Sequence, residues 1–599
     1  MDSFNDIVKS KYHNKPIHIF CIISGKGLSP YCIPKVIEIQ MKESTTILTV
    51  ESGDADILRF IDIPTTRIKN VIQDIFRVDK FSYQITQVQN IERIFILPST
   101  GRERNKLGST YVAYYLGCDL EINTIYELKG YTTTDPSNQT ITHVFHEAIK
   151  IKSDIDSYVL DKSSHILLSQ FNIKDDSVDN IFTHLENLYE SYAHNITKIY
   201  NRFDLHLAID LAFRSVISFR FQNELIAKGW TDVMILGDTR CGKGFIAEKL
   251  AKYFSVGEVV SGENCSIAGL IGGLQQYNGN WAITWGKIPL NDCGMVILDE
   301  ASELQDEAWS KLSRVRSEGI AEITKIQTQV TNARTRLLFI ANPINKTISN
   351  YSYGIQAILD VVKAPEDIAR FDYVLVVSHN EVDMEDINKK HNLVKSKYSI
   401  QSERELVLWI WSRKINEVEF SEEAIKIVYE LSIALAKVYT FTIPLIQGEN
   451  IRVKLAKIAI GFAGRLYSNK NKGKILYVKK VHVICAYTFL NLIYKKEPSG
   501  YYAISKLQKP LSVRDDNKMS KIDKYFNSYR DKRELCKCLL INNNITPNDL
   551  SDHMDLSKEI SREIISYLLK SDCITKRSSY YVKTPNFTSW LKNIILPTK

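Results

Sequence analysis

A short loop at residues 237–244 combines the residue types that bind the phosphates of a nucleotide. The surrounding segment reads DVMILGDTRCGKGFIAEKL, an apolar strand pattern followed by the loop and then by a helical pattern. Glycines let a loop turn its backbone N–H groups toward an anion, and the helix that follows adds its positive end. A lysine at the end of such a loop pairs with the β- and γ-phosphates. The candidate nucleotide-binding residues are Gly237, Asp238, Thr239, Arg240, Cys241, Gly242, Lys243 and Gly244.

Gly244 departs from the usual phosphate loop, in which Ser or Thr follows the lysine. The hydroxyl that is missing here normally ligates Mg²⁺, so metal affinity and turnover are the properties that this departure affects. Taken alone, the loop is as compatible with a glycine-rich turn as with a nucleotide site.

Two further apolar strands end in residues suited to phosphate chemistry. Residues 295–300 read MVILDE, where Asp299 is expected to hold Mg²⁺ and Glu300 to polarise a water for attack on the γ-phosphate. The apolar run at 337–340 is followed by Asn342, which could position the same water. Acidic strand caps and single asparagines in turns are common. Three such strand ends in this order nevertheless favour an ATPase site.

An arginine beyond these strands could serve a second subunit. Arg370 lies in the sequence IARFD, just before the apolar run VLVV. An arginine in this place could reach the γ-phosphate of a neighbouring subunit and stabilise the charge of the transition state. In isolation, a surface ion pair is the more common role for such a residue.

The hydrophobic pattern divides the 599 residues into several units. Apolar strands alternate with helices from about residue 195 to 380, which is typical of a parallel sheet with helical crossovers. The predicted class is a multidomain α/β protein with a P-loop ATPase core. The units are an N-terminal α+β domain (1–105), an OB-like β-barrel region (106–155), a helical linker (156–194), the ATPase core (195–400), a helical lid (401–494), a linker (495–530) and a winged helix (531–599). A purely structural barrel fits residues 106–155 as well as an OB barrel does.

Charge and composition narrow the function classes. The net charge is +8, and residues 501–599 carry 18 Lys and Arg against 11 Asp and Glu. A basic terminal module favours a polyanionic partner, nucleic acid before membrane, although many basic tails are only solvated. The start of the chain lacks a signal pattern, and no apolar run reaches the roughly 18 residues that a bilayer needs, which predicts a soluble, cytoplasmic protein. The ten cysteines form no C-x-x-C pair, so no zinc site is predicted.

Motifs between the phosphate loop and Arg370 resemble the AAA+ motor of the minichromosome maintenance (MCM) helicases. One stretch is similar to that family's insert in helix 2 and contains Ala268-Gly269-Leu270, Gly279-Asn280-Trp281, Gly286 and the turn at 291–294. Another, at 317–335, resembles its hairpin before the sensor strand and includes Asn332-Ala333-Arg334. The resemblance is good from about 195 to 380 and looser to about 494. Within the family it extends to the self-loading helicases of staphylococcal cassette chromosome elements.

The resemblance implies a homo-oligomeric ring, a hexamer, that uses ATP and Mg²⁺ to act on single-stranded and forked DNA beside other replication proteins. It implies that Lys243, Glu300, Asn342 and Arg370 are catalytic. With no hydroxyl at Gly244, Mg²⁺ would rest on Asp299, phosphate oxygens and water. Arg452 falls where the family places a second sensor arginine that acts in trans. The family's N-terminal zinc ribbon has no cysteine pairs here, so an N-terminal ring would form without metal.

Two hairpins and the C-terminal module supply candidate DNA contacts. By resemblance, the tip of the hairpin at 275–281 points into the ring channel, where Tyr277 and Trp281 could stack on bases, although Trp281 fits a core anchor equally. Lys325, on the second hairpin, could pair with phosphate; an unpartnered surface lysine is the simpler alternative. Lys576 and Arg577 fall at the turn of the predicted wing, which contacts DNA backbone in such modules. Winged helices also serve as protein contacts, and the two roles have similar weight.

The leading hypothesis is a hexameric, ATP-dependent DNA helicase that works in the replication of a mobile element or chromosome. The first alternative is an AAA+ chaperone that remodels protein, whose ATPase activity DNA would not affect. The second is a DNA-binding initiator or clamp with weak ATPase activity, which Gly244 favours. The basic C-terminal module favours the two DNA hypotheses over the chaperone.

Overall fold

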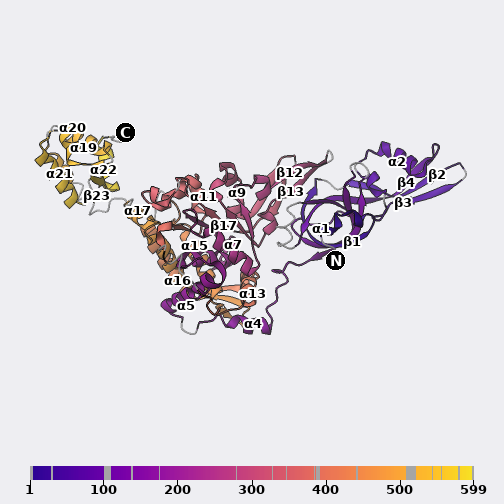
Figure 1. Cartoon of the computed structure of the whole chain (residues 1–599), viewed down its shortest axis with the longest axis horizontal. Coiled ribbons are helices and arrows are strands. Elements are labelled where there is room, and N and C mark those ends of the chain that lie inside the picture. Colours follow the sequence, from indigo (N-terminus) through magenta and orange to yellow (C-terminus); the bar gives the residue numbers. More distant parts are fainter. Residues whose placement is uncertain are drawn as a thin grey trace.

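The N-terminal part of the chain is built on one mainly antiparallel sheet, shown at the right of Figure 1. The computed structural model describes residues 4–28, 31–42, 44–54, 56–61, 63–99, 110–135, 139–173, 176–277, 280–326, 328–345, 347–382, 385, 392–439, 443–507, 521–529, 531–542, 544–554, 556–577 and 580–595. The strands of this lobe are β1 (Pro16–Gly27), β2 (Tyr31–Gln40), β3 (Thr45–Thr49), β4 (Ser82–Pro98), β5 (Tyr111–Tyr115), β6 (Ile125–Thr134) and β7 (Ile141–Ile151). Short helices α1 (Phe4–Ile7) and α2 (Ile68–Phe76) accompany them.

Five of these strands pair in a closed circuit, in the order β1–β6–β7–β5–β4 and back to β1. The boundary predicted at 105/106 is therefore wrong, because β1 and β4 precede it while β5, β6 and β7 follow it. The hydrophobic pattern of each strand predicts a strand, but it does not predict which strands pair. The pairing of β1 with β6 joins residues more than a hundred positions apart. Strands β2 and β3 extend the sheet beyond β4 and, with α2, form a second small core.

The centre of the molecule is a five-stranded sheet in the order β11 (Glu258–Ser261), β14 (Met295–Asp299), β17 (Arg336–Ala341), β10 (Asp232–Gly237) and β18 (Tyr373–Val377). All neighbours are parallel, which confirms the predicted parallel sheet. Every residue of β10, β17 and β18 is buried, and this explains why these strands read as continuous apolar runs. The connections contain α7 (Lys243–Phe254), α8 (Ile267–Leu270), α9 (Asp306–Glu318), α10 (Ile358–Val361) and α11 (Pro365–Ala369).

Helices that precede the sheet strands in sequence, and helices that follow them, pack with the sheet into one hydrophobic core. They are α4 (Lys162–Ser169), α5 (Val178–Tyr192), α6 (Phe203–Phe213), α13 (Ile400–Trp411), α14 (Glu422–Tyr439), α15 (Ile451–Arg465), α16 (Lys480–Lys495) and α17 (Tyr501–Leu507). Small strands β8 (Phe219–Phe221), β9 (Glu224–Ile226), β19 (Val418–Phe420), β20 (Asn469–Lys470) and β21 (Ile475–Val478) lie among them.

Two predicted linkers are corrected by this packing. Residues 156–194 are not a linker, since Leu185 and Tyr189 of α5 are buried in the central core. The stretch 495–530 is divided: Tyr501 of α17 is buried in the central core, whereas Ile522 and Phe526 belong to the C-terminal core. Hydrophobic residues in both segments stand close to charged ones, which concealed their apolar faces.

The C-terminal module has a hydrophobic core of its own and lies apart from the rest in Figure 1. Its elements are α19 (Lys532–Ile541), β22 (Asn544–Ile545), α20 (Pro547–Met554), α21 (Lys558–Lys570), β23 (Ile574–Arg577), β24 (Tyr580–Lys583) and α22 (Pro585–Ile595). The described residues of this module form four helices and three short strands, and Pro547 is the first residue of α20, a position that suits proline because its missing N–H would have no partner in the helix. Among the described residues, no helix has the length and hydropathy to cross a membrane.

Candidate functional site

The phosphate loop leaves the central sheet at the carboxyl end of β10. Gly237 lies so close to β18 that a Cβ would be 2.2 Å from the carbonyl oxygen of Val377. Gly242 precedes α7 with a φ of +81°, a left-handed conformation that glycine adopts without a steric penalty. A Cβ on Gly242 would also meet the side chain of Ile199 at 3.1 Å. The close backbone of β18 therefore requires glycine at 237, the positive φ favours glycine at 242, and the loop passes directly into the first turn of α7.

Lys243 is held at the centre of this loop. Its ammonium donates to the carbonyl oxygens of Gly237 and Asp238 at 2.7 and 2.6 Å, and to Oδ1 of Asn342 at 3.0 Å. Burial lowers the pKa of Lys243 to about 8. The structure thus brings together Lys243 and Asn342, which lie 99 positions apart in sequence. An anion arriving at the loop would meet a buried cation whose only acceptors in the described residues are neutral oxygens.

Asp238 anchors the loop instead of pointing a polar group at phosphate. Its carboxylate accepts hydrogen bonds from the backbone of Ile348, the hydroxyl of Ser378, and the backbone and ring of His379. Burial opposes ionisation of this carboxyl, but the hydrogen bonds prevail and hold the pKa of Asp238 below its usual range. Within the same loop, Thr239 and Arg240 are exposed and Cys241 is buried.

Asp299 occupies the space that a side chain at position 244 would fill. A Cβ on Gly244 would lie 2.5 Å from Oδ2 of Asp299 and 3.0 Å from its Cγ. Burial raises the pKa of Asp299, and the neighbouring carboxylate of Glu300 adds to this. A half-buried carboxylate against the first turn of the phosphate-loop helix is the hard oxygen donor that Mg²⁺ prefers. These residues therefore fit a magnesium ion, with Asp299 next to the glycine that replaces the hydroxyl.

Glu300 follows β14 in a left-handed conformation with a φ of 55°. Its Oε2 accepts a hydrogen bond from the hydroxyl of Ser261 at 3.3 Å. Ser261 was missed by the sequence reasoning, although it ends β11 and lies opposite Asp299 in the register of the sheet. Its signal was the same as for the other site residues, a polar side chain directly after an apolar strand. The carboxyl edge thus gathers Lys243, Asp299, Glu300, Asn342 and Ser261.

Arg370 and Arg452 lie at the opposite, amino edge of the sheet. Arg370 precedes β18 and forms an ion pair with Asp367 at 2.5 Å. Arg452, near the start of α15, pairs with Glu224 at 2.7 Å and stacks over the ring of Tyr429. The two arginine segments touch, because Lys454 of α15 donates to the carbonyl oxygen of Ala369 at 2.7 Å. The structure does not bring either arginine to the phosphate loop of its own chain.

Both predicted hairpins are present. The first pairs β12 (Gly272–Tyr277) with β13 (Asn280–Trp285), and its Asn-Gly tip at 278–279 lies outside the described residues. Trp281 is 40% exposed, so it is not a core anchor, while the side chain of Tyr277 is outside the described part of the structure. The second pairs β15 (Ile320–Thr324) with β16 (Thr328–Asn332), and Lys325 is exposed at its turn.

In the C-terminal module, Lys576 and Arg577 end β23 opposite Tyr581 and Tyr580. Lys576 is exposed, and the side chain of Arg577 is outside the description. Arg334, of the Asn-Ala-Arg signature, forms a bidentate ion pair with Asp292, with Nη2 to Oδ2 at 2.6 Å and Nε to Oδ1 at 3.1 Å. This pair ties the base of the second hairpin to the turn at 291–294.

The first hairpin is also hydrogen-bonded to the N-terminal lobe, which the sequence did not indicate. Gly25, Lys26 and Gly27 of β1 pair antiparallel with residues 282–284 of β13. A Cβ on Gly25 would meet the carbonyl oxygen of Ile283 at 2.3 Å, so glycine is required for this contact. The three-residue pairing makes β12 and β13 the end of the nine-stranded sheet of the lobe.

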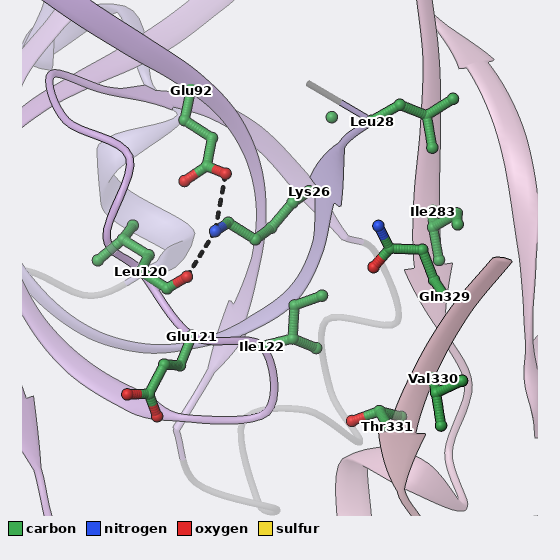
Figure 2. Close-up of a pocket in the computed structure, with 11 residues that line it drawn as sticks. Lys26, Leu28, Glu92, Leu120, Glu121, Ile122, Ile283, Gln329, Val330 and Thr331 are labelled. Atoms are coloured by element: carbon green, nitrogen blue, oxygen red, sulfur yellow. Dashed lines mark hydrogen bonds and ion pairs between the residues drawn. The ribbon is translucent and has the colours of Figure 1, made fainter. Parts of the chain in front are cut away.

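A cavity of about 380 Å³ lies between the lobe and both hairpins. Figure 2 shows the residues that line it. Lys26 crosses its wall, with Nζ 2.7 Å from Oε1 of the buried Glu92 and donating to the carbonyl oxygen of Leu120. Burial raises the pKa of Glu92. On the facing wall, Gln329, Val330 and Thr331 come from β16. The lobe therefore pairs with the first hairpin and shares this cavity with the second, and both hairpins are candidate DNA contacts.

Comparison with known proteins agrees with this geometry. Residues 177–397 match the MCM P-loop domain. The matched segment begins at α5 and includes the phosphate loop, both hairpins, the five strands of the parallel sheet and Arg370.

Distant relatives carry MCM names. The chain is 27% identical over 153 residues to the DNA replication licensing factor MCM4 of Oryza sativa subsp. japonica, covering 25% of this chain and 17% of that protein. It is 23% identical over 225 residues to the DNA replication licensing factor mcm5 of Dictyostelium discoideum, covering 37% and 28%. It is 22% identical over 209 residues to the probable DNA helicase MCM9 of Oryza sativa subsp. indica, covering 35% and 30%. The aligned segments span less than a third of each relative, and they support an MCM-like family for this chain.

Proposed function

We propose that this protein is an ATP-dependent DNA helicase that works as a ring of identical subunits, a hexamer by resemblance. The observation that carries the proposal is the separation of the catalytic groups between two edges of one sheet. Lys243, Asp299, Glu300 and Asn342 lie at the carboxyl edge, and Arg370 and Arg452 lie at the amino edge.

The separation is too long for one chain to complete its own site. The five residues of β18 span about 16 Å between the edges. Val377, at the far end of β18, is the residue that pairs with Gly237 of the phosphate loop. An arginine that precedes Tyr373 therefore cannot reach a nucleotide on the loop of its own chain. In a head-to-tail ring, the same arginine faces the loop of the next subunit, which supports Arg370 and Arg452 as residues that act in trans.

The residues at the carboxyl edge suit ATP hydrolysis. Lys243 and the loop amides would bind the β- and γ-phosphates, and Glu300 would take a proton from the attacking water while Asn342 holds that water in place. Mg²⁺, when bound beside Asp299, would neutralise charge on the phosphates. The Glu300 carboxylate is turned toward Ser261, so one acceptor is already occupied before the reaction.

DNA binding is supported by the placement of two hairpins and a separate basic module. Exposed Trp281 and exposed Lys325 offer a stacking surface and a cation for the backbone of a strand in the ring channel. The helix and strand order of the C-terminal module supports a winged helix, with Lys576 and Arg577 on its wing. The five-strand circuit of the N-terminal lobe supports an OB-like barrel. The resemblance to the self-loading helicases of staphylococcal cassette chromosome elements supports a role in replicating a mobile element or chromosome.

Gly244 supports a second candidate, an initiator or clamp that binds DNA and ATP but hydrolyses ATP slowly. The absent hydroxyl would weaken metal binding unless Asp299 compensates by its closeness to the helix. The protein-remodelling chaperone is the remaining alternative, and DNA dependence of the ATPase activity separates it from the other two.

The deciding experiment measures ATP hydrolysis and strand displacement on a forked DNA, for the wild type and for Glu300→Gln. Displacement by the wild type alone is the expected result. If ATP is hydrolysed without displacement and without any effect of DNA, the chaperone replaces the helicase. If DNA binds while ATP is barely hydrolysed, the initiator or clamp replaces it.

A further inference from the structure

A fully buried arginine lies directly beneath the segment that carries Arg370. Arg316 belongs to the last turn of α9 and has no exposed surface. Its Nε donates to Oδ2 of Asp232, at the start of β10, at 2.7 Å. Its guanidinium also stacks on Phe371 at 4.2 Å and on Phe339 at 5.3 Å. A buried cation with this many fixed contacts cannot move without moving its neighbours.

Arg316 contacts the Arg370 segment on both sides of Arg370. Before it in sequence, Oδ1 of Asp367 lies 3.7 Å from Nη1 of Arg316, and the same oxygen lies 2.5 Å from Nη1 of Arg370. After it in sequence, Phe371 covers the face of the Arg316 guanidinium. Oδ1 of Asp367 therefore lies near two arginines, the buried Arg316 and Arg370, which is proposed to act on the nucleotide of the neighbouring subunit.

The two arginines do not share Asp367 equally. Arg370 is within hydrogen-bond distance, whereas Arg316 is just beyond it. Neither Nη1 nor Nη2 of Arg316 has a hydrogen-bond acceptor among the described residues. Buried donors without partners are costly, so these two nitrogens gain an acceptor if Asp367 moves toward them.

α9 connects this buried arginine to the second hairpin. The helix ends at Glu318, its C-cap Gly319 has a φ of +69°, and β15 begins at the next residue. Gly319 packs so tightly that a Cβ would lie 2.6 Å from the ring of Trp230, so the end of α9 cannot swing freely. Only five residues of β15 separate this junction from the exposed Lys325. A shift of Arg316 is therefore transmitted to the root of the hairpin as a rigid displacement.

We propose that Arg316 and Asp367 form a partner-exchange relay that couples the nucleotide of the neighbouring subunit to the hairpin β15–β16. When Arg370 pairs with the neighbour's γ-phosphate, Asp367 loses its closest cation and turns to Nη1 and Nη2 of Arg316. The end of α9 and the hairpin then follow Arg316. Arg316 is a positioning residue in this relay, since it touches neither nucleotide nor DNA. The relay rests on the proposed function, in which Arg370 acts in trans and the hairpin contacts DNA.

The test compares the affinity of the full-length protein for a fluorescent single-stranded oligonucleotide with ADP and with ATP, in the Glu300→Gln background that blocks hydrolysis. Without further changes we expect the two dissociation constants to differ at least about fivefold, the lower range for coupled sites. Asp367→Asn removes the shared charge at nearly constant shape and should bring the ratio close to one. Affinity for a fluorescent ATP analogue should be kept or rise, because Arg370 no longer has to leave a carboxylate, and this separates lost coupling from lost nucleotide binding.

Asp306→Asn is the matched control, because Asp306 of α9 forms an exposed ion pair at 2.7 Å with Lys363, which lies just before α11. It should keep the full ratio. Arg316→Lys keeps the buried charge but removes one of the two unpartnered nitrogens, so the ratio of the two DNA dissociation constants should be intermediate. If Asp367→Asn does not fold, Arg316→Lys takes its place in the test. A full ratio in a folded Asp367→Asn, or in Arg316→Lys when it stands in, would overturn the relay and leave the helicase proposal intact. Failure of the parent protein to bind DNA would overturn the proposed function and the relay with it.

Discussion

The two edges of the parallel sheet hold charged groups in opposite states. At the carboxyl edge, Lys243 is a buried cation whose partners are carbonyl and amide oxygens, and Asp299 is a half-buried carboxylate next to Gly244, which has no Cβ. At the amino edge, the three arginines of and around the Arg370 segment each have a carboxylate partner: Arg316 with Asp232, Arg370 with Asp367 and Arg452 with Glu224. The cation beside the phosphate loop has no carboxylate in hydrogen-bond contact, whereas these three arginines are already held in ion pairs.

This difference indicates how two copies would work together. The carboxyl edge gains binding energy from an anion directly, because its cation has no anionic partner within hydrogen-bond distance. An arginine of the amino edge must first leave a carboxylate, so its engagement depends on what the neighbouring copy offers. The predictions below separate the two edges, beginning with the largest expected effect.

Replacing Lys243 tests the carboxyl edge. In Lys243→Ala the buried ammonium that meets the phosphates is lost, and we expect ATP turnover to fall about 1000-fold or to background. The measurement is phosphate release at saturating ATP and Mg²⁺. Turnover at the wild-type rate would show that the loop is a glycine-rich turn and not a nucleotide site.

Replacing Arg370 tests the amino edge. Arg370→Ala alone should lower turnover by up to about 1000-fold, as for other arginine fingers. Mixing Arg370→Ala with Lys243→Ala subunits at equal amounts should restore activity, because about a quarter of the interfaces then combine an intact Lys243 with an intact Arg370. Two inactive proteins that stay inactive in every mixture would contradict action in trans.

Gly244→Ser tests whether the missing hydroxyl is a defect or a fitted feature. The new Cβ would stand 2.5 Å from Oδ2 of Asp299, so the carboxylate must move away from α7. We expect the serine to weaken ATP binding about tenfold at low Mg²⁺, about 1.4 kcal/mol, and not to increase turnover. A titration of Mg²⁺ with a fluorescent ATP analogue measures this. Faster turnover in the serine variant would favour the initiator or clamp for the natural chain.

The pH dependence of ATP binding tests the state of Lys243. Burial lowers the pKa of this lysine to about 8 in the free protein, so its ammonium is present below pH 8 and is lost as the pH rises. Phosphate binds the charged form, and affinity should therefore fall several-fold between pH 7 and pH 9. Binding curves at four or five pH values suffice. In Lys243→Arg the decline should vanish, and a decline that persists there would assign it to another group.

Lys325 should give the smallest change. Lys325→Ala removes one exposed cation from the hairpin, so DNA binding should weaken similarly on all sequences. The slope of log affinity against log salt should decrease by about one for each subunit that contacts the strand. An unchanged slope would place Lys325 away from the phosphates and return it to the role of a surface lysine.

The sequence predicted the carboxyl edge better than the amino edge, for a physical reason. Lys243, Asp299, Glu300 and Asn342 each follow a buried strand, and parallel strands bring their carboxyl ends together. The pairing of Arg316 with Asp367 gives no such pattern, since it depends on how α9 packs beneath the sheet. Only the pairing of Asp367 with Arg370 was predictable from the sequence, because Asp367 stands three residues before Arg370 and its helix begins at Pro365.

Long-range strand pairing was also beyond the sequence. Nothing local distinguishes Gly25 from any other glycine in a strand, yet its missing side chain allows β1 to pair with β13. The division at 105/106 failed for the same reason, because the pairing partners of β1 lie far along the chain.

The pairing of β1 with β13 has a consequence for dividing this protein into parts. A fragment that begins at residue 177, where the MCM match starts, retains β13 without β1, and an N-terminal fragment retains β1 without β13. Each fragment presents an open strand edge, a surface that promotes association between copies and aggregation. Self-association of either fragment in solution would therefore reflect the strand edge that the cut exposes, and not the interface between subunits of a ring.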